Sequence, residues 1–141
     1  MEFVTGMNAF CHFQVMSNEL STPKVLVCPA DSGWQEKFAT NFTAFSNSNI
    51  SFFVGIVPNE TNANLILSGD RNITNGTPIR NGLLRLTTNT LAGWTSDMHN
   101  RVGNIGLADG SVQQDSMTGL QNQIADTGVA TNLVQMPVLD P

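Results

Sequence analysis

Charged side chains are scarce in this sequence, and basic side chains are the scarcest of them. Asp, Glu, Lys and Arg make up 12% of the residues, which is about half of the usual share. The six Lys and Arg residues stand singly in a chain whose net charge is −5. No basic face can therefore neutralise phosphates or anionic lipid, and we expect no nucleic-acid partner.

Long apolar runs are missing as well. A bilayer-spanning helix needs about 20 consecutive apolar residues, whereas the longest comparable runs here are 25–28 and 52–57, the second interrupted by Gly55. The sequence also shows no basic segment followed by an apolar one, as a secretory signal peptide would. We therefore expect no membrane-crossing segment, and either a cytosolic protein or one whose export segment is not part of this sequence.

Cysteine is limited to Cys11 and Cys28, which lie far apart and form no CxxC pair. This spacing predicts neither a zinc site nor a thioredoxin-like motif. Two free, buried thiols are the favoured interpretation, and one disulfide in an oxidising compartment is the alternative.

The sequence does contain enough apolar material for one domain. With 141 residues, 40% of them hydrophobic, a single core of moderate size can form. Phe3, Met7 and Phe10 follow a helical spacing, which predicts a helix that ends near Met16. A short strand is expected over 24–28. Helical turns are expected where aromatic residues recur at helical intervals, namely at Trp34, Phe38, Phe42 and Phe45.

The second half of the chain predicts strands and one helix. Runs rich in β-branched and aromatic residues predict strands over 50–57, 65–68 and 83–88. A helix is expected from Ser116, its cap, to about Thr127, with Gly128 as its stop. A last edge strand is expected over 133–136.

A spaced motif lies near the C-terminus, where His99 is followed by nine residues and then by Asp109-Gly110. Asp-Gly is favoured where a tight turn needs positive φ, so it predicts a hairpin between strands over 104–108 and 111–114. We expect His99 to lie where the chain enters the first of these strands, hydrogen-bonded to a loop carbonyl. The core-facing side chains of the hairpin are expected to be Ile105, Leu107 and Val112.

With this motif, the chain resembles the bacterial pseudopilin-like proteins, a group marked by His, nine spacers and Asp-Gly. Three earlier segments, 23–31, 49–55 and 67–72, are similar to blocks that recur in the same order in that group. The resemblance covers about residues 20 to 115. The chain departs from the family at its start, because it lacks the prepilin cleavage site, the glutamate near the mature start and the apolar half-helix. The calcium loop of major pseudopilins also finds no counterpart here.

The resemblance implies an α+β, pilin-like fold in which an N-terminal helix packs on an antiparallel β-sheet, with a short C-terminal helix. As a single head domain, it would comprise a helix remnant (1–16), a connecting region (17–49) and the sheet with its C-terminal helix (50–141). The implied function is that of a structural subunit of a type II secretion or related type IV filament system. Its partners would be other pseudopilins and secretion-machine subunits, and the isolated head would be monomeric.

The same resemblance implies a place in the cell envelope. The head would be periplasmic or extracellular, and the full-length protein would be anchored in the inner membrane by its N-terminal helix. We expect no catalytic, cofactor or metal site, and we interpret His99, Asp109 and Gly110 as a structural motif. The alternative is that His99, with Asp97 or Asp109, binds a metal or moves protons.

Three other kinds of site can be drawn from the residues of this sequence. A Cys–His–Asp hydrolase would use Cys28, His99 and either Asp70 or Asp109, but no local pattern activates the thiol, so a small buried side chain is favoured for Cys28. A calcium site would take two of the loop aspartates Asp31, Asp70, Asp97 and Asp109. A stand-alone extracytoplasmic, carbohydrate-binding module would use exposed aromatic rings, with Trp34 and Trp94 as candidates, although a packed tryptophan is commoner.

Overall fold

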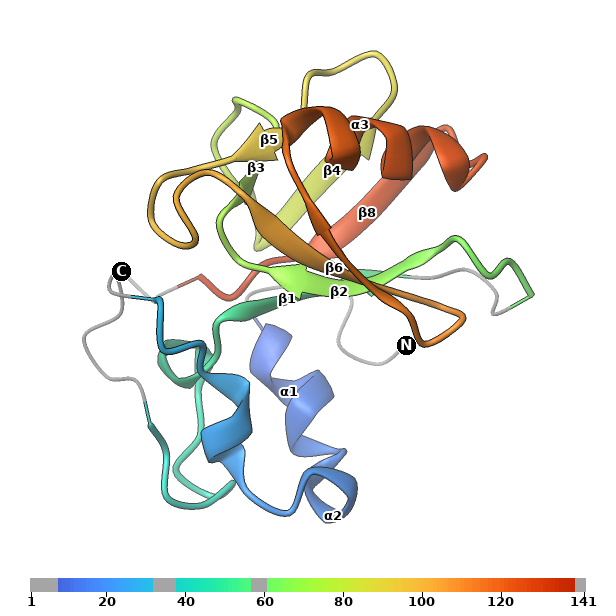
Figure 1. Ribbon diagram of the computed structural model, residues 1–141. Helices are drawn as coiled ribbons and strands as arrows, with labels where there is room; N and C mark the ends of the chain where they lie inside the picture. Colours follow the sequence, from blue (N-terminus) through green and yellow to red (C-terminus); the bar gives the residue numbers. More distant parts are fainter. Residues whose placement is uncertain (1–7, 32–37, 57–60, 139–141) are drawn as a thin grey trace.

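A six-stranded antiparallel sheet, in the order β4-β8-β1-β2-β6-β7, forms the centre of the molecule (Figure 1). The computed structural model describes residues 8–31, 38–56 and 61–138. The strands of this sheet are β1 (Phe52–Ile56), β2 (Ile66–Asp70), β4 (Leu83–Thr87), β6 (Gly103–Leu107), β7 (Val112–Asp115) and β8 (Thr131–Gln135). Two shorter strands, β3 (Ile73–Thr74) and β5 (Gly93–Trp94), pair separately.

The strands follow the β-branched and aromatic runs of the sequence. The expected strands over 50–57, 65–68 and 83–88 are confirmed as β1, β2 and β4. β1 alternates half-buried and buried positions along its length, as a strand with one covered face does. The last strand, β8, is also present, but the expectation of an edge strand is wrong because β8 lies between β4 and β1.

The Asp109-Gly110 hairpin forms between β6 and β7. Its turn is closed by a hydrogen bond from the amide of Gly110 to the carbonyl of Leu107 (3.0 Å), and Gly110 has a φ of +87°. A residue with positive φ after two turn residues is the pattern of a three-residue hairpin loop, and glycine adopts it without steric cost. The core-facing set is only partly confirmed, since Ile105 and Leu107 are buried whereas Val112 is 68% exposed.

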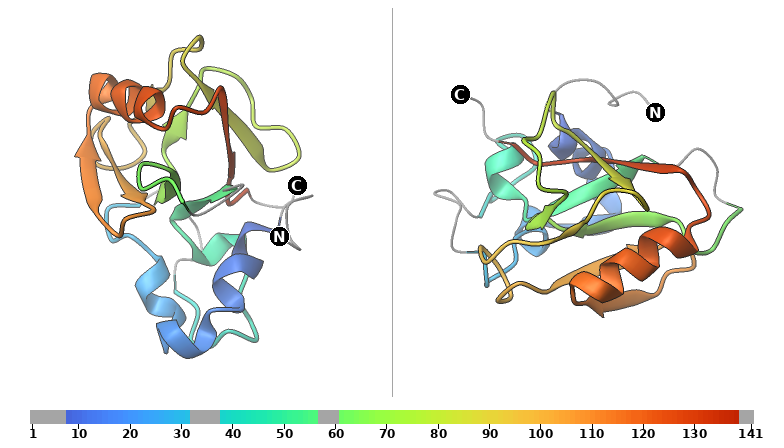
Figure 2. Two further views of the ribbon diagram at one scale, coloured as in Figure 1. Left: turned by 90° about the vertical axis from the view of Figure 1, so that its right-hand side faces the viewer. Right: turned by 90° about the horizontal axis from the view of Figure 1, so that it is seen from above.

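The helix α3 (Met117–Asp126) covers one face of the sheet (Figures 1 and 2). It begins and ends as expected, with the hydroxyl of Ser116 accepting from the amide of Gly119 (3.2 Å) and with Gly128 at a φ of +65°. Leu120 and Ile124 are fully buried in the main apolar cluster. The other members of this cluster come from the sheet and its connections, namely Phe53, Ile66, Ile73, Leu84, Leu86, Ala92, Trp94, Ile105, Leu107, Val134 and Met136.

The described residues of the N-terminal part of the chain, 8–31 and 38–50, form short helices and turns on the opposite side of the sheet from α3 (Figure 2). Its elements are the helices α1 (Ala9–Gln14) and α2 (Ser17–Leu20) and the 3₁₀ turns η1 (Pro23–Leu26) and η2 (Asn47–Asn49). They enclose a second apolar cluster formed by Ala9, Leu26, Ala39, Phe45 and Ile50, against which Phe10, Phe13, Leu20 and Phe42 pack.

The expected fold, an N-terminal helix packed on an antiparallel sheet, is wrong. The antiparallel sheet is present, but in the described residues the N-terminal helices have six and four residues. Helix α1 ends at Gln14, and the two apolar residues that follow it, Val15 and Met16, are 67% and 44% exposed. The aromatic residues of α1 pack into the second cluster, and the longest helix on the sheet is the C-terminal α3.

Two smaller expectations for the N-terminal part are also wrong. Residues 24–28 form no strand, because Thr22 caps the 3₁₀ turn η1 and Pro23 occupies its first position. Phe42 and Phe45 lie in irregular turns rather than in a helix, while Trp34 and the early residues Phe3 and Met7 are outside the described residues. Within 8–31, 38–56 and 61–138, no helix combines the length and apolar character needed to cross a membrane.

Candidate functional site

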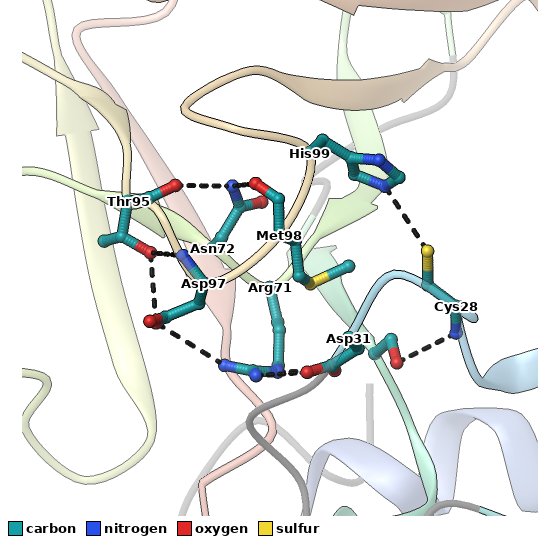
Figure 3. Close-up of polar contacts among 9 residues, drawn as sticks. Cys28, Asp31, Arg71, Asn72, Thr95, Asp97, Met98 and His99 are labelled. Carbon is teal, nitrogen blue, oxygen red and sulfur yellow. Dashed lines mark hydrogen bonds and ion pairs between the residues drawn. The ribbon is translucent and has the colours of Figure 1, made fainter.

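Asp70, the last residue of β2, and Asn72, two residues after it, organise the loop that carries His99. The Nδ2 atom of buried Asn72 lies 3.0–3.1 Å from the carbonyl oxygens of Thr95, Met98 and Val102. Asp70, at the end of β2, accepts from the backbone amide and the side chain of Asn104 (2.8 and 2.9 Å). The loop 95–104 is therefore fixed at several points by Asp70 and Asn72. Figure 3 shows Asn72 beside Thr95 and Met98.

The backbone at His99 adopts a conformation that L-residues seldom take. His99, Asn100 and Arg101 have φ values of +49°, +53° and +67°. Such values cost free energy for residues other than glycine, although His and Asn tolerate them better than most, and they persist only where the surroundings impose them. The carbonyls held by Asn72 on either side of this turn impose it here.

The side chain of His99 meets Cys28 and Asp70. Its Nε2 lies 3.3 Å from Sγ of Cys28 (Figure 3). The same nitrogen lies 3.4 Å from Oδ2 of Asp70. Asp70 is 2% exposed, and the side chain of His99 is 23% exposed. The structure thus brings together three residues that are far apart in the sequence.

A second ion pair lies beside this cluster. Arg71 donates from Nε to Oδ2 of Asp31 (2.7 Å) and from Nη2 to Oδ1, so that the guanidinium and the carboxylate form a two-pronged pair. Asp31 is completely buried, and Arg71 is 11% exposed. Asp97 reaches the other side of the guanidinium at 4.0 Å and is 57% exposed. The guanidinium therefore provides the positive charge that Asp31 and Asp97 face.

Ser51 ties the remaining segment into the same junction. Its hydroxyl accepts from the amide of Cys28 (3.0 Å), its amide donates to the carbonyl of Leu26 (2.9 Å), and its carbonyl accepts from the amide of Arg71 (2.9 Å). We call the set Cys28, Asp31, Ser51, Asp70, Arg71, Asn72 and His99 the polar junction. All four segments that carry the family resemblance contribute to it.

The structure places the predicted motif residues in two separate surroundings. His99 belongs to the polar junction, where its Nε2 faces the thiol of Cys28 and the carboxylate of Asp70. The expectation that His99 bonds a loop carbonyl is therefore wrong. Asp109 and Gly110 turn the hairpin, where Asp109 accepts from the amide and the hydroxyl of Ser111 (2.9 and 2.6 Å). These hydrogen bonds hold the pKa of Asp109 below its usual range.

Cys28, His99 and Asp70, which the hydrolase alternative would use, do come together in the structure. A Cys–His–Asp relay places the nucleophile and the orienting carboxylate on opposite ring nitrogens. Here the thiol and the carboxylate both face Nε2. The arrangement therefore differs from that of a hydrolytic triad. The expectation of a buried Cys28 is also wrong, since Cys28 and Cys11 are both partly exposed, and they are free thiols.

The four loop aspartates do not share a site. Asp31 and Asp97 face Arg71, Asp70 faces Asn104 and His99, and Asp109 sits in the hairpin turn. In the described part of the chain, no group of three His, Cys, Asp or Glu side chains is placed to hold a metal ion.

A shallow groove of about 200 Å³ reaches the polar junction at Asp70. It crosses the sheet surface from β1 to β7, between Phe52 and Val112, over Ser68, Gly69, Asn104 and Gly106. A larger hollow of about 530 Å³ lies against β4, beside Arg80 and Arg85, and no motif residue lines it.

Trp94, one of the two candidate sugar-binding rings, is 5% exposed and belongs to the main apolar cluster. A buried ring offers no stacking face to a sugar. The other candidate, Trp34, lies outside the described residues.

Sequence reasoning missed the residues that build the junction. In the sequence, Arg71 and Asn72 belong to the segment 67–72 that carries part of the family resemblance, and Ser51 belongs to the expected strand over 50–57. No local motif marks any of the three as a site residue. An arginine and an asparagine directly after a strand, in a chain with only six basic residues, were the available signal. The pairing of Arg71 with Asp31 spans a separation in sequence that no local pattern reveals.

Comparison with protein-family models, with curated proteins and with solved structures gives no match for this chain.

Proposed function

We propose that this chain is the head domain of a pseudopilin-like structural subunit of a type II secretion or related type IV filament system, and that it has no catalytic activity of its own. The observation that carries the proposal is the polar junction. The four segments on which the resemblance rests are dispersed over about ninety residues of sequence, and they meet at one place in the fold.

The junction has the character of a structural device. It joins the N-terminal part of the chain to the sheet through Cys28 and Asp31 on one side and Asp70, Arg71 and His99 on the other. In a filament subunit, force passes between the segment that lies in the filament and the exposed sheet. A buried, two-pronged ion pair with hydrogen-bonded neighbours resists such a displacement better than isolated surface contacts.

The proposal places the protein in the cell envelope, with the head in the periplasm or outside the cell and other pseudopilins as partners. Such a subunit needs an apolar N-terminal helix of about 20 residues and a prepilin-type cleavage with methylation. The test is therefore to recover the native protein from its source cells with antibodies against this chain and to determine its mature N-terminus by mass spectrometry. Sheared surface filaments and membrane fractions are analysed in parallel.

A methylated N-terminus followed by an apolar segment, in the membrane or filament fraction, is the expected result. A conventional signal-peptidase product released from the membrane would instead indicate a stand-alone extracytoplasmic binding module. A product with no export segment, recovered from the cytosol, would overturn both assignments. In the same cells, Arg71→Met should reduce recovery in the filament fraction, while Asp97→Asn, on the exposed side of the same guanidinium, should leave it unchanged.

A further inference from the structure

Two acceptors face one nitrogen in the polar junction, and this determines where a proton is held. Nε2 of His99 lies 3.4 Å from the carboxylate of Asp70 and 3.3 Å from the sulfur of Cys28. An unprotonated Nε2 would direct its lone pair at the Asp70 carboxylate, which is unfavourable. A protonated Nε2 satisfies the carboxylate and can also face a thiolate at Cys28. The tautomer protonated at Nε2 therefore satisfies Asp70 and offers the sulfur of Cys28 a hydrogen-bond donor.

We propose that Cys28 is the site of thiol–disulfide exchange in this protein, with the Nε2–H of His99 as the hydrogen-bond donor to its thiolate and Asp70 as the residue that keeps the proton on Nε2. The pair is held in place before any reagent arrives. Asn72 fixes the carbonyls on both sides of the left-handed turn at His99, and Ser51 accepts from the amide of Cys28.

The exchange needs no other reactant than a disulfide. Cys28 loses its proton to water, and the thiolate, which faces the Nε2–H of His99, attacks one sulfur of a disulfide R–S–S–R along the axis of its S–S bond. The S–S bond of the reagent breaks as the new bond to Cys28 forms, and the electron pair leaves with the second sulfur as RS⁻. That thiolate takes up a proton from water, so the products are a mixed disulfide at Cys28 and one RSH.

The charge near Cys28 favours an uncharged disulfide. The carboxylate of Asp70 lies 3.4 Å from Nε2 of His99, and the chain carries a net charge of −5. An anionic disulfide would meet repulsion at this point, whereas a neutral aromatic one would not.

Cys11 provides an internal comparison. It is also partly exposed, and burial raises the pKa of its thiol, which keeps it protonated and slow to react. The histidine beside it in sequence, His12, is engaged with Oε1 of Gln135 at 2.6 Å. The two thiols thus differ in what lies beside the sulfur rather than in whether a reagent can reach it.

The test uses single-thiol variants of the 141-residue chain and the neutral reagent dithiodipyridine. Cys11→Ser leaves Cys28, and Cys28→Ser leaves Cys11. At neutral pH we expect Cys28 to react about tenfold or more faster than Cys11. In the Cys11→Ser background, His99→Asn should lower the rate at Cys28 about tenfold, because asparagine tolerates the left-handed backbone but lacks the Nε2–H that faces the sulfur. His12→Gln is the matched histidine control and should leave that rate unchanged.

The charge preference gives a second readout that a purely structural role would not change. Asp70→Asn should lower the rate with dithiodipyridine and raise the relative rate with anionic dithiobis(nitrobenzoate). Circular dichroism establishes that each variant is folded. If His99→Asn does not fold, the pH dependence of the Cys28 rate is measured in the Cys11→Ser variant, in which Cys28 and His99 are both present. Equal rates at Cys28 and Cys11, or a Cys28 rate that neither His99→Asn nor Asp70→Asn changes, would overturn the proposal.

Discussion

The residues from Phe52 onward and the residues before Ser51 each enclose an apolar cluster, but they hold their backbones in different ways. In the sheet region, strand pairing and α3 fix the chain, and thirteen buried residues fill the cluster. In the described residues of the N-terminal region, 8–31 and 38–50, the helices have at most six residues, and the second cluster has five buried members. The smaller region has little backbone pairing to the sheet, so its position depends on side-chain contacts.

Those contacts include hydrogen bonds outside the polar junction. His12 reaches Gln135 of β8 (2.6 Å), and Nδ2 of Asn47 donates to the carbonyl of Val138 (2.8 Å). Hydrogen bonds of this kind each contribute about 1 kcal/mol net. We therefore expect the sheet region to keep its structure when the N-terminal region opens, and we do not expect the reverse. Each of the following predictions tests this difference, starting with the largest expected effect.

Phe53→Ala should have the largest effect. The side chain is fully buried in the main cluster, and its removal leaves a cavity among β1, β2 and α3. The expected loss is about 3–5 kcal/mol of unfolding free energy, measured by urea denaturation. Phe45→Ala makes the same chemical change in the second cluster, where we expect hydrogen exchange to accelerate in residues 8–50 and the sheet amides to stay protected. If Phe45→Ala exposes the sheet amides as much as Phe53→Ala does, the two regions unfold as one unit.

Arg71→Met should separate the regions by breaking the ion pair between them. It leaves the carboxylate of Asp31 completely buried without the guanidinium that faces it. Stranding one member of a buried pair costs about 3 kcal/mol or more. Asp97→Asn, which removes the exposed partner at 4.0 Å, should change stability by less than about 0.5 kcal/mol. Equal denaturation midpoints for Arg71→Met and Asp97→Asn would show that the pair does not hold the N-terminal region.

Gly55→Ala tests how closely the strands of the sheet region approach. A Cβ at this position would lie 1.9 Å from the carbonyl oxygen of Ile66, a backbone atom that cannot move without shifting β2. We expect a loss of about 1–3 kcal/mol. Gly106→Ala is the matched control, because its Cβ would meet only the Ser68 carbonyl oxygen, at 3.7 Å. A denaturation curve for Gly55→Ala that coincides with that of Gly106→Ala would contradict the tight β1–β2 contact.

Much of the sheet region could be predicted from the sequence, because its signals are local. Strand residues alternate or cluster, Asp109-Gly110 marks its turn, and Ser116 and Gly128 mark the ends of α3. The place of β8 could not be predicted. Its sequence fits an edge strand or an internal strand equally well, and only its pairing with both β1 and β4 decides between them.

The N-terminal region and the candidate site were harder to predict for the same physical reason. Phe10 and Phe13 are spaced as on a helix that covers a sheet, yet they pack on Leu26 and Phe45 in a separate cluster. The sequence allows Cys28, Asp70 and His99 to be combined as a hydrolase site, but no local pattern indicates that they lie close together. Their meeting depends on the left-handed turn at His99, which Asn72 imposes from another segment.

The smallest expected effect distinguishes two aspartates within the sheet region. Asp115, at the end of β7, is 8% exposed, and its Oδ2 is buried without a hydrogen-bond partner. Desolvation raises its pKa above the ordinary value of 3.8. The charged form is therefore less stable in the folded protein than in the unfolded chain. This cost is absent below pH 3.8, where both states are protonated, and appears as pH rises through the folded pKa.

Asp115→Asn removes that cost, so it should raise the unfolding free energy at neutral pH by less than about 1 kcal/mol and leave it unchanged in acid. Asp109→Asn should have the opposite sign, because the pKa of Asp109 is lowered by its hydrogen bonds with Ser111. Its stabilising contribution is present above the unfolded value and is lost as pH falls through the folded pKa. Urea midpoints of both variants, measured from pH 3 to pH 7, check the two signs together. Two variants that shift stability in the same direction at neutral pH would show that the surroundings of one carboxylate have been assigned wrongly.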